Sequence, residues 1–176
     1  MADFCDKIKA IRNCELVQAA ASDENGEATF YVAQGVETLS TLEKDLNHGN
    51  RVTWEGGDLK EIKVQKLKLD DILANRDAKK IDFITIDVEG HEMSVLKGLS
   101  LDTFQPRIII IEDSSHGLNR MVINYLAKCG YVRFNITGCN DWYARRRGLS
   151  DQSRTVAFCR RKILAENYRG SHQSAY

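Results

Sequence analysis

Residues 81–92 read IDFITIDVEGHE, an apolar run that stops at acids and a glycine. Isoleucine, phenylalanine and threonine suit the pleated surface of a sheet, so the run predicts a buried strand that leaves the sheet near Asp87 and enters a helix. In an open α/β sheet, ligands bind where the carboxyl ends of the strands meet. The stretch therefore predicts a ligand-binding edge.

The alternation of strand and helix continues beyond this stretch. It predicts a helix over 93–99, a strand over 107–112, a helix over 118–129 and a strand over 131–136. The second of these, a run of isoleucines, is typical of a strand that is covered on both faces. Such alternation implies parallel pairing with right-handed crossovers, and hence an α/β sandwich.

The rest of the chain adds further elements. The sequence predicts helices over 4–11 and 69–73 and strands over 15–21, 28–32, 61–67 and 155–160. Residues 34–57 have a weaker pattern, which we interpret as a partly helical excursion that ends at 48–50. A loop with arginines at 145–147 precedes the last strand. We expect one domain over 1–162 and a polar tail over 163–176.

The composition indicates a soluble globular protein. The 176 residues are 43% hydrophobic and 28% charged, and 25 Lys and Arg balance 25 Asp and Glu, which argues against a protein-wide surface for nucleic acid or an anionic membrane. The longest aliphatic run is too short to span a bilayer, and the charged N-terminus does not read as a secretory signal, so we expect a cytoplasmic protein. The five scattered cysteines lack zinc spacing and predict reduced, mostly buried thiols.

Three common motifs are missing from the sequence. It contains no Gly-x-Gly-x-x-Gly, no Gly-x-x-x-x-Gly-Lys and no Gly-x-Ser-x-Gly. The pair Gly56-Gly57 lies in a polar loop before a strand, which is the wrong context for a phosphate-binding loop. Nucleotide hydrolysis and serine hydrolysis are therefore disfavoured.

Acidic residues end two of the predicted strands. Asp87 and Glu89 project to the same side if the strand continues through both. Glu112 ends the next long strand, and pairing of the two strands would make a rim of three carboxylates. Such a rim suits an ammonium, sugar hydroxyls or a hard cation such as magnesium. The alternative is structural, with Asp87 accepting backbone bonds and Glu89 and Glu92 capping a helix, and we favour it only for Glu92.

Other polar side chains lie on the loops that leave these strands. His91 has a pKa range that suits proton abstraction, whereas a histidine at a helix start more often makes a local polar contact, so both roles stay open. His116 follows Glu112 together with Asp113 and Ser114. The arginines at 145–147 either attract an anionic substrate or form a solvated loop, which is the commoner case.

Four blocks of the sequence resemble a known family. They are residues 14–26 (CELVQAAASDENG), 67–73 (LKLDDIL), 81–90 (IDFITIDVEG) with 95–98 (VLKG), and 108–112 (IIIIE). Together they are similar to the FkbM-type S-adenosylmethionine-dependent methyltransferases, over about residues 12–137. The resemblance implies a Rossmann-like sandwich with a mostly parallel central sheet. It also implies methylation of hydroxyl groups on small molecules such as sugars and secondary metabolites.

The resemblance further implies roles for the site residues. Ser22 and Asp23 are expected near the adenine side of the cofactor, and a positioned carboxylate or histidine assists loss of the hydroxyl proton. The expected cofactor contacts are Ser22, Asp23 and Asp87, the expected catalytic residues are Asp87, Glu89 and His91, and the expected substrate contacts are Glu112 and His116.

One part of the family pattern has no counterpart in this sequence. Family members start with a strand and a glycine-rich turn that holds the methionine part of the cofactor, followed by a strand whose terminal acid binds the ribose hydroxyls. We expect an N-terminally truncated fold that exposes a sheet edge. Two alternatives follow: a non-catalytic interaction module whose exposed edge binds a partner or a second copy, and a metal-dependent enzyme that uses Asp87, Glu89 and His91.

Overall fold

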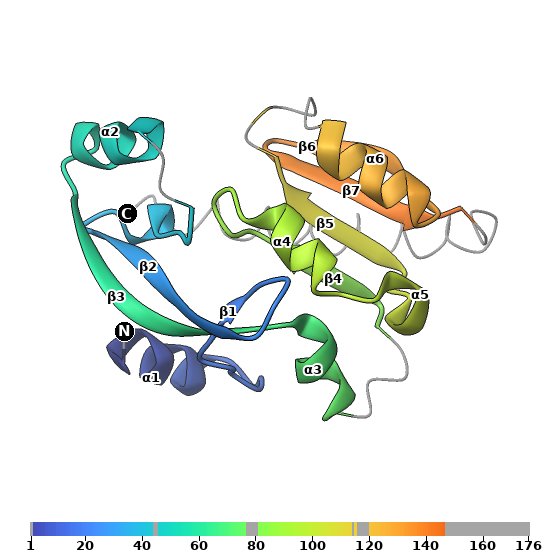
Figure 1. Ribbon diagram of the computed structural model, residues 1–176, viewed down its shortest axis with the longest axis horizontal. Helices are drawn as coiled ribbons and strands as arrows, with labels where there is room; N and C mark the ends of the chain where they lie inside the picture. The colour runs from blue at the N-terminus through green and yellow to red at the C-terminus, as the bar shows by residue number, and fades with distance from the viewer. Residues whose placement is uncertain (1, 44–45, 77–80, 114, 116–119, 147–176) are drawn as a thin grey trace, which may run out of the picture.

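The computed structural model describes residues 2–43, 46–76, 81–113, 115 and 120–146 (Figure 1). Its helices are α1 (Ala2–Ile11), the 3-10 turn η1 (Glu37–Leu39), α2 (Leu46–Trp54), α3 (Leu69–Ala74), α4 (Glu92–Lys97), α5 (Leu101–Phe104) and α6 (Arg120–Lys128). Its strands are β1 (Ala20–Ala21), β2 (Gly26–Gln34), β3 (Asp58–Leu67), β4 (Phe83–Ile86), β5 (Ile108–Glu112), β6 (Tyr131–Thr137) and β7 (Asn140–Arg145). None of the described helices is long and apolar enough to cross a membrane.

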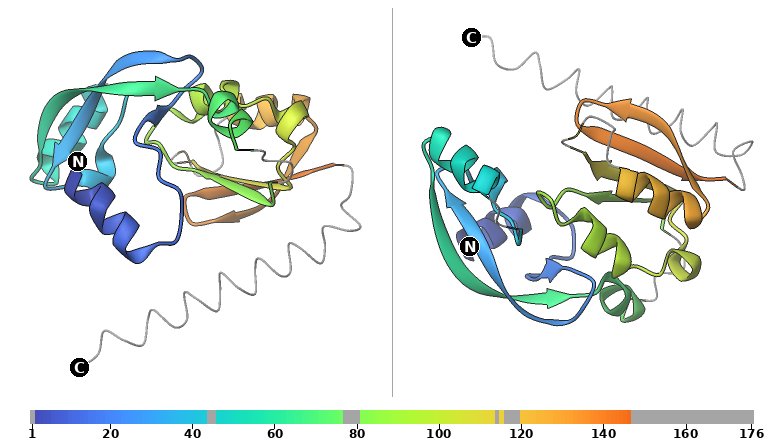
Figure 2. Two further views of the ribbon diagram at one scale, coloured as in Figure 1. Left: turned by 90° about the horizontal axis from the view of Figure 1, so that it is seen from below. Right: turned by 45° about the horizontal axis from the view of Figure 1, so that its top comes forward.

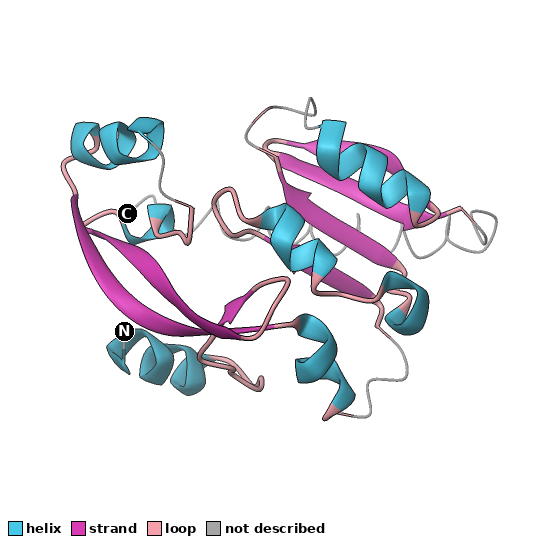
Figure 3. Cartoon of the chain, in the orientation of Figure 1, coloured by secondary structure: helices cyan, strands magenta, loops and turns pink. Residues whose placement is uncertain are grey.

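The strands form two sheets, which Figure 3 shows next to each other. One sheet has the order β1-β3-β2 and the other has the order β4-β5-β7-β6. In the four-stranded sheet, β4 and β5 pair in parallel, whereas β7 pairs antiparallel with both β5 and β6. In the three-stranded sheet, β1 is parallel to β3 and β2 is antiparallel to it. The α/β class agrees with the sequence, but the expected mostly parallel central sheet is not confirmed, because both sheets are mixed.

The antiparallel strand β7 forms where the sequence predicted a loop. Thr137 pairs with Asn140 across a two-residue turn, and Gly138 at the first turn position has a φ of 59°. Glycine adopts this left-handed backbone without steric cost, which allows the tight hairpin. Trp142 and Tyr143 then belong to two different buried clusters of the sheet. Because β7 lies between them, β6 does not pair with β5, although the two strands run in the same direction. The strand predicted over 155–160 lies outside the described residues.

The main core lies between the four-stranded sheet and the helices on one of its faces, and Figure 2 shows α4 and α6 on that face from two further sides. Ile109 and Ile111 of β5 belong to this core, together with buried residues of α4 and α6. Ile108 and Ile110 belong to a second cluster with Trp142. All four isoleucines are buried, so the prediction of a strand covered on both faces is confirmed.

The three-stranded sheet has a much smaller core. It is built on the long antiparallel pair of β2 and β3, in which Gly26 lies opposite Lys66. The buried residues of its core are Ala33, Leu39 and Val52. The connection between β2 and β3 carries η1 and α2, so these elements belong to the same part of the molecule.

Two predicted elements in this part differ in extent from the structure. The strand expected over 15–21 is limited to Ala20–Ala21, because only these residues pair with β3. The helix expected to end at 48–50 instead runs through these residues, since α2 ends at Trp54. The leucines at 39, 42 and 46 have helical spacing in the sequence, but they do not share one helix, because Leu39 belongs to the separate turn η1 and α2 begins at Leu46.

The end of β1 packs closely against the end of α4. A Cβ atom on Gly98 would lie 2.0 Å from the carbonyl oxygen of Ser22, so glycine is needed for this approach. The Ser22 N–H donates to the Leu67 carbonyl at 3.0 Å, and the Asp70 N–H donates to the Gly98 carbonyl at 3.0 Å. The first bond extends the pairing of β1 with β3. The second bond and the close contact of Gly98 with Ser22 connect the three-stranded sheet to the end of α4.

The four described cysteines are free thiols. Cys5 and Cys129 are half-buried, whereas Cys14 and Cys139 are exposed. The prediction of mostly buried thiols is therefore wrong for these four residues, because Cys14 and Cys139 lie in exposed turns and Cys129 is only half-buried where it packs against the main core.

Candidate functional site

A left-handed turn after β4 brings the predicted acids together. β4 ends at Ile86, and Glu89 and Gly90 have φ values of 49° and 100°. The strand therefore does not continue through Glu89, so Asp87 and Glu89 do not project to one side as residues of a strand. The predicted rim of three carboxylates forms nevertheless, through the turn. One oxygen from each of Asp87, Glu89 and Glu112 lies within 4.8 Å of the others, because β4 and β5 are parallel neighbours.

Two of these acids, Glu89 and Glu112, have raised pKa values. Burial raises the pKa of Glu112 to about 7, helped by its hydrogen bond with Asp87 and by the negative charge of the neighbouring acids. Burial also raises the pKa of Glu89, against the lowering effect of the Arg51 charge. A carboxyl group that titrates near neutral pH is suited to taking up or releasing a proton. The cluster of Asp87, Glu89 and Glu112, called the carboxylate cluster below, therefore combines proton exchange with attraction for a cation.

Residues from both sheets hold this turn in place. Thr41 is buried, and its Oγ1 donates to the Glu89 carbonyl oxygen at 2.8 Å. Arg51 on α2 forms an ion pair with Glu89 at 3.7 Å. The Gly90 N–H donates to Glu92 Oε1 at 2.9 Å, which agrees with the helix-start role favoured for Glu92. The backbone and side chain of Glu89 are thus held by the connection between β2 and β3.

His91 lies where three loops meet. Its Nε2 is 3.0 Å from Ser22 Oγ, and its Nδ1 is 2.7 Å from Glu43 Oε1. Ser22 Oγ lies 3.1 Å from Asp23 Oδ1, to which it can donate. The structure thus brings the predicted cofactor contacts Ser22 and Asp23 next to the predicted catalytic His91. Both ring nitrogens of His91 have protein partners, so proton abstraction by this residue requires one of the two contacts to open.

The other polar residues named from the sequence have different positions. His116 and Ser114 lie outside the described residues. Asp113 is buried, and its Oδ1 accepts a hydrogen bond at 2.9 Å from the backbone N–H two residues later, as in a local turn. Arg145 belongs to β7 and not to a loop, and its guanidinium carbon lies 5.9 Å from the centroid of the Tyr131 ring.

Three residues that shape the site were not found from the sequence. They are Thr41, Glu43 and Arg51, all in the segment between β2 and β3 whose sequence pattern is weak. Thr41 and Glu43 each lie 48 residues before the partner that they bind. Single polar residues at such a distance from their partners have no spacing that would distinguish them from surface residues.

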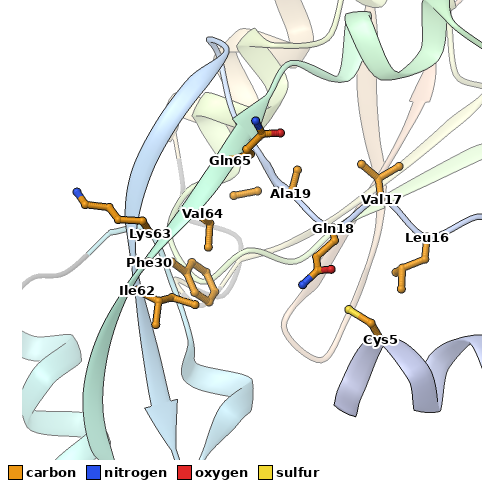
Figure 4. Close-up of a pocket in the computed structure, with 11 residues that line it drawn as sticks. Cys5, Leu16, Val17, Gln18, Ala19, Phe30, Ile62, Lys63, Val64 and Gln65 are labelled. Carbon is orange, nitrogen blue, oxygen red and sulfur yellow. The ribbon is translucent and has the colours of Figure 1, made fainter. Parts of the chain in front are cut away.

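A separate cavity of about 470 Å³ lies between α1 and the three-stranded sheet (Figure 4). Its lining residues are Cys5, Leu16, Val17, Gln18, Ala19, Ala20, Phe30, Ile62, Lys63, Val64 and Gln65. Figure 4 shows Phe30 on one side of the cavity and Cys5 of α1 on the other. The lining is mostly apolar and contains no carboxylate or histidine. The cavity therefore lacks the acids and bases that gather after β4.

Comparison with known proteins agrees with the four blocks of sequence. A family model described as a methyltransferase FkbM domain matches residues 5–133, which is well over half of the chain. No curated protein and no solved structure matches the chain significantly. The matched range contains the carboxylate cluster together with Ser22, Glu43 and His91. The chain therefore belongs to the FkbM methyltransferase domain family.

Proposed function

We propose that this chain transfers a methyl group from S-adenosylmethionine to a hydroxyl group of a small molecule. Membership of the FkbM family supports methyl transfer in general. The observation that supports S-adenosylmethionine and a hydroxyl acceptor is the carboxylate cluster. Its member Glu89 comes two positions before His91, which contacts Ser22.

The charge of the cluster fits a cationic cofactor. S-adenosylmethionine supplies a methyl group on a positively charged sulfonium, and its methionine part carries an ammonium group. Three carboxylate oxygens within 4.8 Å of one another favour a positive charge at this place, more so where the site is partly desolvated. The exposed carboxylate of Asp23 offers acceptor oxygens to the polar groups of a nucleoside.

The cluster also suits the proton that a hydroxyl group loses on methylation. Burial and the neighbouring acids raise the pKa of Glu112 to about 7, which matches a group that accepts a proton at neutral pH. An Asp87 oxygen lies within 4.8 Å of a Glu112 oxygen, and the hydrogen bond and negative charge of Asp87 both favour the protonated form of Glu112. We assign proton acceptance to this pair, and we assign to Glu89 the orientation of the acceptor hydroxyl, because its backbone and side chain are both held.

An interaction module is the second candidate function, and open strand edges support it. Among the described strands, β4 pairs only with β5, and β1 pairs only with β3. Phe83 on β4 is 59% exposed. An open edge can pair with a strand of a partner or of a second copy. Light scattering across a range of concentrations tests whether the chain associates with a second copy. If it does so through the edge of β4, Phe83→Lys should weaken the association.

Thermal unfolding in the presence of ligands tests the leading proposal. S-adenosylmethionine and its demethylated product are each added with and without magnesium. A ligand at 100 times its Kd stabilises the folded state by about 2.7 kcal/mol. Asp87→Asn should remove the stabilisation. The control Asp82→Asn should keep it, because Asp82 lies at the opposite end of β4, beside Arg107.

Two other outcomes decide between the alternatives. If neither nucleoside stabilises the protein at millimolar concentration, the proposal of a cofactor-binding methyltransferase is wrong. If magnesium alone stabilises it and Asp87→Asn removes that effect, the metal-dependent alternative is favoured, with Glu112 in place of His91, since both nitrogens of His91 are already engaged.

A further inference from the structure

The segment that follows η1 reaches across to the turn after β4 (Figure 1). Thr41 pairs with Tyr31 of β2 through two backbone hydrogen bonds, of 2.9 and 3.1 Å. Its buried Oγ1 donates to the Glu89 carbonyl and accepts the Glu43 N–H at 2.9 Å. A Cβ atom on Gly90 would lie 3.9 Å from the Cβ of Glu43, so the two backbones are close. Glu43 is therefore held beside the turn by its own backbone.

The side chain of Glu43 continues this connection through His91 to Ser22. Glu43 Oε1 lies 2.7 Å from His91 Nδ1, and His91 Nε2 lies 3.0 Å from Ser22 Oγ. A carboxylate only accepts hydrogen bonds, so Nδ1 carries a proton in this arrangement. Glu43 thereby fixes both the orientation of the imidazole ring and the nitrogen that faces it, as carboxylates do for histidines elsewhere.

The connection joins the two sides of the site. Ser22 and Asp23 follow β1, whereas Glu89 and His91 follow β4. Residues 22 and 91 are 69 positions apart in the sequence, and the bond between Ser22 and His91 links their loops through side chains. The side chain of His91 is only 10% exposed, so water competes little for this bond.

We propose that Glu43 is a positioning residue of the methyl-transfer site, which acts through His91 and Ser22 to hold the Asp23 loop against the turn that carries Glu89. That the site transfers methyl groups rests on the proposed function. The role of Glu43 rests on its contact with His91 and on the contact of His91 with Ser22. Glu43 itself touches neither the carboxylate cluster nor, in this role, the reacting atoms.

Ser22, His91 and Glu43 are linked in the order serine, histidine and acid. In hydrolases this arrangement activates the serine for attack. The burial of Ser22, which is 1% exposed, disfavours that function, because a nucleophile has to meet its substrate. The Ser22 hydroxyl also has Asp23 as a second partner. Positioning is therefore the better account.

The test uses Glu43→Ala, the conservative Glu43→Gln, and Glu27→Ala as a control at an exposed glutamate on β2. NMR spectra of the ¹⁵N-labelled His91 ring report which nitrogen carries the proton, and a His91→Gln variant assigns the signals. We expect Nδ1 to be protonated in the wild type and in Glu27→Ala, and to lose this preference in Glu43→Ala. Glu43→Gln should retain part of it, since its amide oxygen still accepts a hydrogen bond.

The functional readout is the affinity for S-adenosylmethionine. Glu43→Ala should weaken binding roughly 10-fold, as expected for the loss of one hydrogen bond to a charged group, while Glu43→Gln recovers most of the affinity. If wild type binds the cofactor and Glu43→Ala changes neither the His91 signals nor the affinity, the positioning role is wrong. If no cofactor binds but the His91 signals still depend on Glu43, the proposed function fails and the positioning of His91 stands. Covalent labelling of Ser22 by a fluorophosphonate would overturn the inference in favour of a nucleophilic serine.

Discussion

The two sheets contribute to the site in different ways. The four-stranded sheet provides Asp87 and Glu112 at the ends of β4 and β5, and eleven of the described residues are buried in the core behind it. The three-stranded sheet provides Thr41, Glu43 and Arg51 from the connection between its long strands, and its core has three buried residues among those described. Parts with fewer buried apolar contacts open at lower free energy. The acids therefore lie on the more stable part, and the residues that brace them lie on the less stable one.

This difference allows the acids to stay in place while the part that covers them opens for a ligand. Opening of the three-stranded part would release the bonds to Glu89 and His91 without unfolding β4 and β5. Asp87 and Glu112 would stay together, because they lie at the ends of paired strands in the larger core, whereas Glu89 would lose the contacts that hold it.

The largest effect is expected where the two sheets meet. In Gly98→Ala the new Cβ would lie 2.0 Å from the Ser22 carbonyl oxygen, and backbone atoms cannot move aside cheaply. We expect a loss of more than about 3 kcal/mol in the free energy of unfolding, measured by urea denaturation. The control is Gly49→Ala in α2, where the nearest atom to the new Cβ is 3.9 Å away and no loss is expected. Equal stability of the two variants would contradict the close packing at this joint.

The second prediction compares the two cores with matched substitutions. Leu96 lies in the larger core and Leu39 in the smaller one, and both are 2% exposed or less. Leu96→Ala should lower the global free energy of unfolding by about 2–5 kcal/mol. Leu39→Ala should instead speed hydrogen exchange in β2 and β3 while β5 keeps its protection. Loss of protection in β5 at the same rate would show that both sheets unfold together and that the comparison is wrong.

A smaller effect is expected from the titration of Glu112. Its pKa is raised from 4.5 to about 7 in the folded protein, so between these values the folded state holds a proton that the unfolded chain has released. The free energy of unfolding should therefore fall as the pH rises from about 5 to 8, by about 1 kcal/mol or less after solvent screening. Glu112→Gln should flatten this part of the profile, whereas Glu27→Gln should not. An unchanged slope in Glu112→Gln would disprove the raised pKa.

The smallest effect is expected at Arg51. Its ion pair with Glu89 is partly exposed, so Arg51→Ala should cost less than about 1 kcal/mol of stability. The pKa of Glu89 should rise further, because the Arg51 charge lowers it in the wild type. A ¹³C NMR titration of the Glu89 carboxyl group measures this. The control Glu55→Gln removes the other ion pair of Arg51 and should leave the pKa of Glu89 unchanged.

Much of the larger sheet could be predicted from local sequence. The apolar runs before Asp87 and Glu112 identified β4 and β5, and the rule that parallel strands end at one edge predicted that their acids would meet. The left-handed backbone of Glu89 could not be predicted, because this conformation is uncommon for a residue other than glycine. The turn at Gly138 was a detectable signal for β7, since a glycine first in a two-residue loop is typical of a hairpin.

The bracing residues could not be predicted for a different reason. Glu43 reaches His91 only after the three-stranded sheet has packed beside the other sheet, and this depends on contacts such as that between Gly98 and Ser22. Local periodicity contains no information about such packing between distant segments. The contact between His91 and Ser22 also became visible only in three dimensions.

Calorimetric titration of S-adenosylmethionine into the full chain tests the central claim most directly. We expect saturable one-to-one binding by the wild type and by Asp82→Asn, and a loss of at least about 10-fold in affinity for Asp87→Asn, since a charge-assisted contact to the cofactor is removed. Absence of binding by the wild type, or equal affinities of Asp87→Asn and Asp82→Asn, would contradict the claim that the carboxylate cluster after β4 and β5 is a methyl-transfer site.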